Sequence, residues 1–173
     1  MSPVDDCTVL FRALPPHLKF SPAEKRTVIS FARTLALRVV DGRSFTCLIT
    51  GDSELHRLNR TFLAHDYPTD VLSFPTCDVS SSLGEMAISA DRAEAQAVAF
   101  GHQCIDEVRI LMLHGVLHLA GMDHEQDSGE MARAERKWRT KLNLSEGLIV
   151  RTTASSSPGV RAPSPASTKR RQQ

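Results

Sequence analysis

Three histidines in one short stretch, His114, His118 and His124, are the residues of this sequence best suited to bind a metal ion. The first two are four residues apart, so in a helix their side chains lie on one face. Gly121 follows where a helix commonly ends, because glycine adopts the left-handed C′ conformation without steric cost. The chain can then fold back and bring His124 beside the other two. Three imidazoles that leave one tetrahedral position to water are typical of a catalytic zinc site.

Two other interpretations of this stretch need weighing. The segment from Ile110 to Ala120 is apolar almost all round, so its histidines could be hydrogen-bonded core residues, but the paired spacing, the glycine and the third histidine argue against this. The spacing also matches metzincin zinc proteases, H-x-x-x-H-x-x-G-x-x-H. Those proteases have a glutamate as general base directly after the first histidine, whereas this chain has Gly115. The ligand spacing therefore fits a zinc protease, but the general base that such a protease needs is missing.

Gly115 itself needs a reason, because glycine costs about 1 kcal/mol of helix propensity relative to alanine. Close approach of a substrate or of a neighbouring backbone to the helix is the reason we expect.

The four cysteines are widely spaced without a C-x-x-C pair, which indicates free thiols in a reducing cytoplasm. The sequence contains no apolar run long enough to span a membrane and no signal-peptide pattern at its start. We therefore expect a cytoplasmic protein that does not associate with membranes.

The charge is distributed unevenly along the 173 residues. Residues 151–173 contain five basic residues and no acid, which leaves 16 basic against 20 acidic residues elsewhere. This last segment is rich in Ser, Pro, Thr and Ala and cannot bury a core, so we expect a folded domain over 1–150 and a disordered basic tail over 151–173. The tail could add weak affinity for nucleic acid, or it could be a solvated segment without a role.

Periodicity and turn residues predict nine elements in the order β-α-β-α-β-β-α-α-α. Strands are expected at 8–12, 45–50, 71–74 and 85–89, with a Ser-rich loop at 76–83. Helices are expected from Pro22 to about residue 40, from about 53 to 63, from 91 to 100, from 104 to 120, and after Asp127. This order favours an α+β fold, a mixed sheet of about four strands with helices packed on it, and the three-histidine zinc site at the end of a central buried helix.

Capping residues and apolar stripes predict how the helices are anchored. Ser21 and Glu24 form a capping box, Asp52 or Ser53 caps the second helix, and Asp127 with Glu130 caps the last one. The stripes expected to face the core are Leu55, Leu58 and Phe62 in the second helix, and Met131, Ala134, Trp138 and Leu142 in the last.

At this point the sequence resembles a known family, the YbeY endoribonucleases, which are bacterial rRNA maturation factors. The residues from His114 to His124 match the family's H-G-x-L-H-L-x-G-x-D-H, and those from Pro68 to Pro75 match its P-T-D-V-L-S-F-P. The resemblance covers roughly residues 8–145. It implies a single-strand-specific endoribonuclease that acts in 16S rRNA 3′-end maturation, ribosome assembly and ribosome quality control, with rRNA, the small ribosomal subunit and assembly factors as partners. It also implies one Zn²⁺ per chain on His114, His118 and His124.

One position departs from the family pattern, which usually has an arginine where this chain has Leu63. An arginine there would be a natural phosphate clamp, since its planar guanidinium pairs bidentately with phosphate. Arg60, three residues earlier, could reach the same space, or it could be a solvated surface charge.

The remaining site residues have both a functional and a structural interpretation. Asp123 could orient a histidine or take a proton, or it could cap the turn after Gly121. Thr69, Asp70 and Ser73 could line the substrate cleft, or could serve the turn and strand entry. The nucleophile could be water activated by the metal or the 2′-hydroxyl of the RNA.

The sequence is also compatible with a function of another class. The protein could be a ribosome-assembly factor that binds RNA or protein and whose zinc is structural. A fourth protein ligand would favour that alternative, and an exchangeable water would favour the enzyme.

Overall fold

The computed structural model describes residues 7–77 and 82–145, and both the predicted tail 151–173 and the predicted domain end at 150 lie outside them. The predicted order of elements is confirmed. The elements are β1 (Thr8–Phe11), α1 (Pro22–Val39), β2 (Ser44–Thr50), α2 (Asp52–Leu63), β3 (Val71–Pro75), β4 (Ser82–Ser89), α3 (Ala90–Phe100), α4 (Cys104–Leu119) and α5 (Glu130–Lys141).

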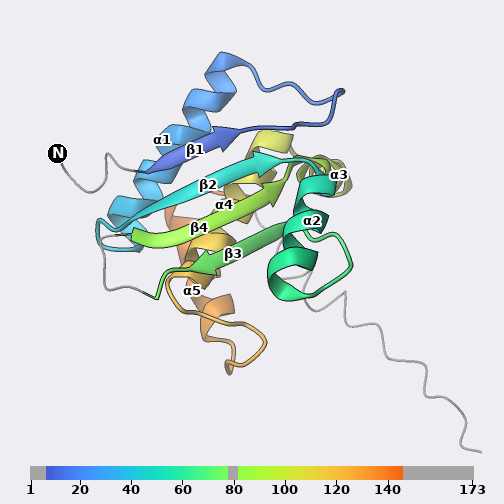
Figure 1. Ribbon diagram of the computed structural model, residues 1–173. Helices are drawn as coiled ribbons and strands as arrows, with labels where there is room; N and C mark the ends of the chain where they lie inside the picture. The colour runs from blue at the N-terminus through green and yellow to red at the C-terminus, as the bar shows by residue number, and fades with distance from the viewer. Residues whose placement is uncertain (1–6, 78–81, 146–173) are drawn as a thin grey trace, which may run out of the picture.

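The four strands form one mixed sheet in the order β1-β2-β4-β3 (Figure 1). β1, β2 and β4 are parallel, and β3 runs antiparallel to β4 along one edge. Gly84 of β4 has a φ of +127°, and a Cβ there would overlap the carbonyl oxygen of Phe74. Glycine is therefore required at this position of β4, opposite the end of β3. The predicted fold class, α+β with a mixed sheet of about four strands, is confirmed.

The two faces of the sheet carry separate hydrophobic clusters, because successive side chains of a strand point to opposite faces. Met86 and Ile88 of β4 belong to the larger cluster, which includes α1 and α4, whereas Ala87 packs with Leu55 of α2 on the other face. In Figure 1, α1 and α4 lie behind the sheet and α2 lies at its other side. The sheet is thus covered most completely on the face of α4.

Helix α4 is buried along most of its length, as its all-round apolar sequence predicts. A Cβ on Gly115 would lie 2.9 Å from Sδ of Met86 and 3.2 Å from Cγ2 of Val71. The groups that approach Gly115 are therefore two side chains of the sheet, and not the substrate or backbone that was expected. The hydroxyl of Ser73 also donates to the Gly115 carbonyl at 3.1 Å. These contacts hold β3 against the middle of α4.

The capping box of Ser21 and Glu24 is confirmed at the start of α1. The cap predicted for α2 is wrong: Gly51 is the N-cap residue, and Asp52 is already helical. The amide of Asp52 instead donates to the Asp91 carboxylate at 2.7 Å, so a side chain from α3 supplies the acceptor that a local cap would have supplied.

The start of α5 also differs from the prediction, since its N-cap residue is Gly129. Asp127 nevertheless accepts hydrogen bonds from the amides of Gly129 and Met131, both at 2.7 Å. The Met131 amide contributes most to lowering the pKa of Asp127. The Asp127 carboxylate therefore anchors α5 from a position two residues before the N-cap residue Gly129.

Other differences concern single side chains and one strand start. Phe62 was expected in the core but is 63% exposed, because it borders an open pocket over the α2 face of the sheet, where its ring packs edge-on against Phe74. β4 begins at Ser82, inside the predicted loop. The four cysteines all lie within the described residues, and none forms a disulfide, as predicted. In the part of the chain that the structure describes, no helix has the length and hydropathy needed to cross a membrane.

Candidate metal centre and its cavity

The end of α4 sets the position of the third histidine. Gly121 has a φ of +94°, and its amide donates to the His118 carbonyl at 2.9 Å. The Met122 amide donates to the Leu117 carbonyl at 3.1 Å, which completes a Schellman motif. The chain therefore reverses at Gly121, as predicted, and His124 returns toward the helix.

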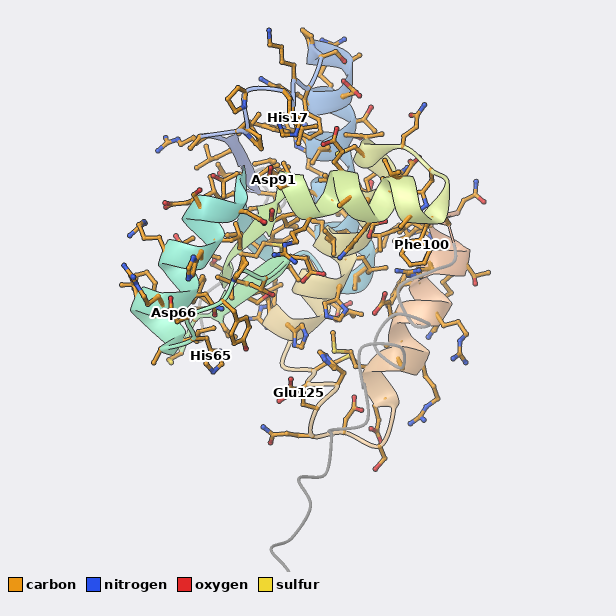
Figure 2. All side chains as sticks on the ribbon, turned by 90° about the vertical axis from the view of Figure 1, so that its right-hand side faces the viewer. His17, His65, Asp66, Asp91, Phe100 and Glu125 are labelled. Carbon is orange, nitrogen blue, oxygen red and sulfur yellow. The ribbon has the colours of Figure 1, made fainter. Side chains whose placement is uncertain are left out.

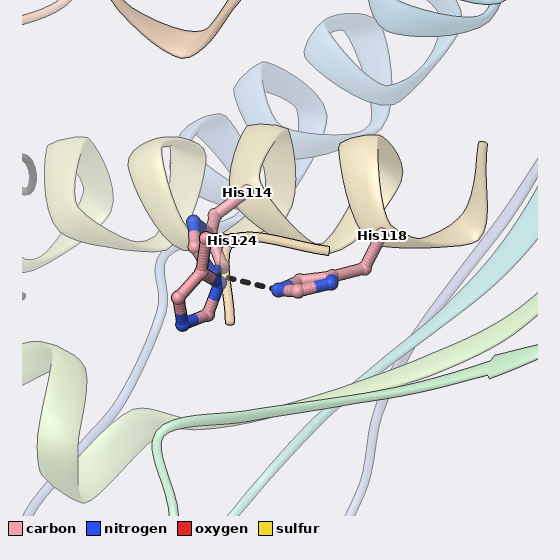
Figure 3. A group of neighbouring side chains, drawn as sticks. All are labelled: His114, His118 and His124. Atoms are coloured by element: carbon pink, nitrogen blue, oxygen red, sulfur yellow. Dashed lines mark hydrogen bonds between the residues drawn. The ribbon is translucent and has the colours of Figure 1, made fainter. Parts of the chain in front are cut away.

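The three histidines converge on one point (Figure 3). One ligand-capable nitrogen from each of His114, His118 and His124 lies within 4.8 Å of those of the other two. The ring centroids are 4.7 Å apart for His114 and His118, 5.4 Å for His114 and His124, and 5.1 Å for His118 and His124. Among the described residues, no fourth His, Cys, Asp or Glu joins this group.

Hydrogen bonds determine which ring nitrogen of His114 and of His118 is available to bind a metal ion. Nδ1 of His118 lies 2.9 Å from the Met122 carbonyl oxygen, so it must carry the proton and donate. Nδ1 of His114 lies 3.0 Å from Oε2 of Glu135, which favours a proton there as well. Both Nε2 atoms then present lone pairs, and these atoms are only 3.1 Å apart. Two converging lone pairs repel each other unless a cation lies between them, so the donor set fits a metal ion.

The protonation state of His118 suits the same role. Burial, and then the neighbouring His114 and His124, lower the pKa of His118 to about 4. The ring is therefore neutral near pH 7. Neutral imidazole is the form that coordinates metal ions.

Helix α5 contributes a buried carboxylate behind the first histidine. Glu135, which holds Nδ1 of His114, is 4% exposed, and its Oε1 lies 2.9 Å from Nη2 of Arg139, itself 3% exposed. A carboxylate on the far nitrogen of a ligating histidine fixes the ring's tautomer and orientation. Glu135 is not among the site residues predicted from the sequence. Its position four residues after Met131, on the apolar stripe of α5, is the signal that could have revealed it.

A cavity of about 760 Å³ opens beside the histidines. Its walls come from the end of α2 and the loop after it, the edge strand β3, and the turn after α4. Figure 2 views the molecule from this side, with His65 and Asp66 below α2 and Glu125 in the turn after α4. The acidic residues that line the cavity are Asp70, Asp123 and Glu125, and no Lys or Arg among the described residues lines it.

Thr69, Asp70 and Ser73 all line this cavity. Each also has a structural contact. Asp70 accepts from the Val71 amide at 2.9 Å and from Gln96 at 3.1 Å, Thr69 lies 3.5 Å from Asp70, and Ser73 donates to Gly115. The structure thus brings the three residues to the cavity and shows that their side chains also hold its wall in place.

Asp123 and Leu63 line the cavity, whereas Arg60 does not. Asp123 lines the cavity, and its Oδ1 accepts from the Glu125 amide at 3.0 Å, which is the turn-capping contact considered above. Leu63 lines the cavity and is 44% exposed. Arg60 is exposed on α2 and is not among the lining residues.

These features define a class of protein: an α+β fold in which three converging histidines, able to hold a metal ion, lie beside an open cavity. The family model described as Endoribonuclease YbeY matches residues 22–143. The chain therefore belongs to the endoribonuclease YbeY family. The predicted family is confirmed, and so is the prediction that the protein is an enzyme of the nuclease class.

Individual relatives extend this match over most of the chain. Endoribonuclease YbeY of Solibacter usitatus is 54% identical over 151 residues, which cover 87% of this chain and 98% of that protein. The protein of the same name from Koribacter versatilis is 53% identical over 106 residues, covering 61% of this chain and 69% of that one. A solution structure from Thermotoga maritima superimposes with a TM-score of 0.53 at 22% identity, covering 88% of this chain and 99% of that one, which supports the fold.

Proposed function

We propose that this protein is a zinc-dependent, single-strand-specific endoribonuclease. The observation that carries the proposal is the pair of Nε2 atoms of His114 and His118, 3.1 Å apart beside the cavity, in a chain of the YbeY family. A zinc ion held by three histidines lowers the pKa of a bound water to about 7 and polarises a phosphoryl oxygen, which are the properties that phosphodiester cleavage needs.

The chain's own residues prepare this site before RNA binds. Glu135 and the Met122 carbonyl hold two rings with their Nε2 atoms toward the cavity. Ser73 and Asp70 hold the β3 wall opposite. Asp123 lies at the cavity beside His124, where we propose that it orients the histidine or accepts a proton from the attacking group. A concave site of this kind favours a single strand, whose bases and backbone can be splayed out, over a regular duplex.

The proposed biological role follows the family resemblance. Curated relatives from several bacteria carry the name Endoribonuclease YbeY. We infer that the RNA is rRNA, that the reaction serves maturation of the 16S 3′ end, ribosome assembly and ribosome quality control, and that the protein meets the small ribosomal subunit and its assembly factors in the cytoplasm.

One observation favours the alternative, an RNA- or protein-binding assembly factor with a structural zinc. Among the described residues, the cavity is lined by no cation that could clamp a phosphate, and Leu63 occupies the position where the family usually has arginine. The ligand set argues for the enzyme, however, because structural zinc sites have four protein ligands and the described residues supply three.

Cleavage of a single-stranded RNA from the 16S 3′ end by the full-length protein tests the proposal. We expect cleavage that a chelator abolishes and added zinc restores, and much slower cleavage of the same sequence in a duplex. The variant His118→Ala, purified in parallel, controls for contaminating nucleases and should be inactive. Zinc-loaded protein that binds the RNA without cleaving it would favour the assembly factor.

A further inference from the structure

The charge of the cavity raises the question of what holds an RNA strand there. Its acidic residues are Asp70, Asp123 and Glu125, and no Lys or Arg among the described residues lines it. Phosphate contacts normally supply most of the affinity of a protein for nucleic acid. Besides the metal ion proposed above, contacts of another kind are therefore needed in this cavity to position the strand.

Two aromatic side chains at the edge of the cavity offer such a contact. His65 and Tyr67 both line it, and their rings are stacked with centroids 5.3 Å apart and an interplanar angle of 15°. The Tyr67 hydroxyl and Nδ1 of His65 are 3.2 Å apart, which fixes the two rings relative to each other. Tyr67 is 55% exposed. An exposed ring of this size, already stacked on its neighbour, can extend the stack by one more flat group.

The loop that carries these rings is held in a defined conformation. The side-chain amide of Asn59, which is 1% exposed, donates to the Tyr67 carbonyl at 2.7 Å. The His65 amide donates to the Asn59 carbonyl at 3.3 Å, after Ala64 has ended α2 in the left-handed conformation. One buried residue therefore anchors the backbone on both sides of the stack. Rings that are already fixed lose little conformational entropy on binding.

We propose that Tyr67, supported by His65, is a stacking platform for one unpaired nucleobase of the RNA. Stacking suits this cavity because it needs no cation and accepts any base. It also selects for a single strand, since the bases of a duplex have their faces covered. The inference rests on the proposed endoribonuclease function and adds to it a subsite for one base at a fixed distance from the cleaved bond.

The test is a scan of short single-stranded oligoribonucleotides in which each nucleotide in turn is abasic, cleaved by the full-length, zinc-loaded protein. We expect one abasic position at a fixed distance from the cleavage site to lower kcat/KM about 5- to 150-fold, the effect that base–aromatic stacking generally has. The loss should appear mainly in KM. The absence of any sensitive position in the wild-type protein would overturn the platform without any variant being made.

Variants then identify the ring responsible. Tyr67→Ala should lower kcat/KM for the intact oligonucleotide by the same factor, and the sensitive abasic position should have no further effect in this variant. Tyr67→Phe keeps the ring and loses only its 3.2 Å contact with His65, so it should retain most of the wild-type kcat/KM. Phe100 supplies a matched control, because it stacks on His102 with centroids 6.5 Å apart and an angle of 17°, outside the cavity (Figure 2). Phe100→Ala should leave the abasic profile unchanged.

The outcomes separate this inference from the proposed function. Cleavage by the wild type, combined with independent, multiplicative effects of Tyr67→Ala and the abasic position, would refute the platform and leave the nuclease proposal intact. A loss as large in Tyr67→Phe as in Tyr67→Ala would also refute it, because the hydroxyl would then be the group that matters. A wild-type protein that cleaves no single-stranded RNA would overturn the proposed function, and the platform with it.

Discussion

Oε2 of Glu135 lies 3.0 Å from Nδ1 of His114, although the two residues are 21 positions apart and belong to different helices. Through this contact α5 becomes part of the candidate metal centre without supplying a ligand. Loss of such a carboxylate typically costs 10- to 100-fold in metal affinity. We therefore expect Glu135→Gln to bind zinc about 10- to 100-fold more weakly, as measured by competition with a chelator of known affinity.

Because Arg139 would lose its buried ion pair with Glu135 in that variant, stability must be followed as well. Removing one member of a buried ion pair typically costs about 3–5 kcal/mol. Glu130→Gln, an exposed change on the same helix, is the matched control: it should leave the zinc affinity unchanged and cost far less stability, because its contacts with the Ser128 amide and Arg133 are exposed. Wild-type zinc affinity in a folded Glu135→Gln protein would show that the carboxylate does not support the site.

The variant His118→Ala should lose tightly bound zinc, because two histidines remain for a site that needs at least three protein ligands. Elemental analysis after gel filtration measures this directly. Zinc should raise the thermal midpoint of the wild type, since a ligand at 100 times its Kd adds about 2.7 kcal/mol of stability. The midpoint of the variant should not respond. A full equivalent of zinc retained by His118→Ala would contradict the three-histidine site.

The close contact at Gly115 predicts an unusual response to alanine. Alanine normally stabilises a helix by about 1 kcal/mol relative to glycine. Here its Cβ would lie 2.9 Å from Sδ of the buried Met86, and overpacking of this kind costs about 1–3 kcal/mol. We expect Gly115→Ala to be net destabilising by roughly 1 kcal/mol in urea unfolding.

A double-mutant cycle tests the cause. The cost of Gly115→Ala should shrink by at least about 0.5 kcal/mol in a Met86→Ala background, because the two residues touch. Gly121→Ala is the control: its φ of +94° is strained for alanine, but nothing lies within 4 Å of its Cβ position. Its cost should therefore be independent of Met86. A stabilised Gly115→Ala protein would show that the helix and sheet are packed less tightly than described.

Leu63 predicts a gain of function. Leu63→Arg places a cation in a cavity whose charged residues within the described ranges are acids, so RNA binding should tighten and become more dependent on salt. One added phosphate contact steepens the slope of log K against log salt by about 0.7 for single strands. Leu37→Arg, at a leucine that is 59% exposed on α1, is the control and should leave the slope nearly unchanged. The variant Arg60→Ala should cleave RNA nearly as fast as the wild type, because Arg60 does not line the cavity.

Local sequence signals predicted much of this structure. Helix α4, the reversal at Gly121 and the cap at Ser21 all depend on residues within one or two turns of each other, so spacing alone identified them. The order of the elements followed from the same signals, and a mixed sheet followed from that order. What spacing could not supply was the partner of each element.

The incorrect or missing predictions involve partners distant in sequence. Asp91 serves the start of α2 from 39 positions away, so no local pattern marks Gly51 as the N-cap residue. Phe62 continues the stripe of its helix, but it borders an open pocket lined by sheet residues rather than a closed core. Glu135 falls on the apolar stripe of α5, but no local pattern shows that its partner is His114, 21 positions earlier.

All three candidate ligands lie within the stretch from His114 to His124, whereas β3, which forms the wall opposite, comes from about 40 residues earlier in the chain. The affinity for the ion and the shape of the space in front of it therefore depend on different segments. Substitutions in the loop before β3 can change which RNA fits without changing how tightly the ion is held. A protein of this design can acquire new substrates while its reactive centre stays the same.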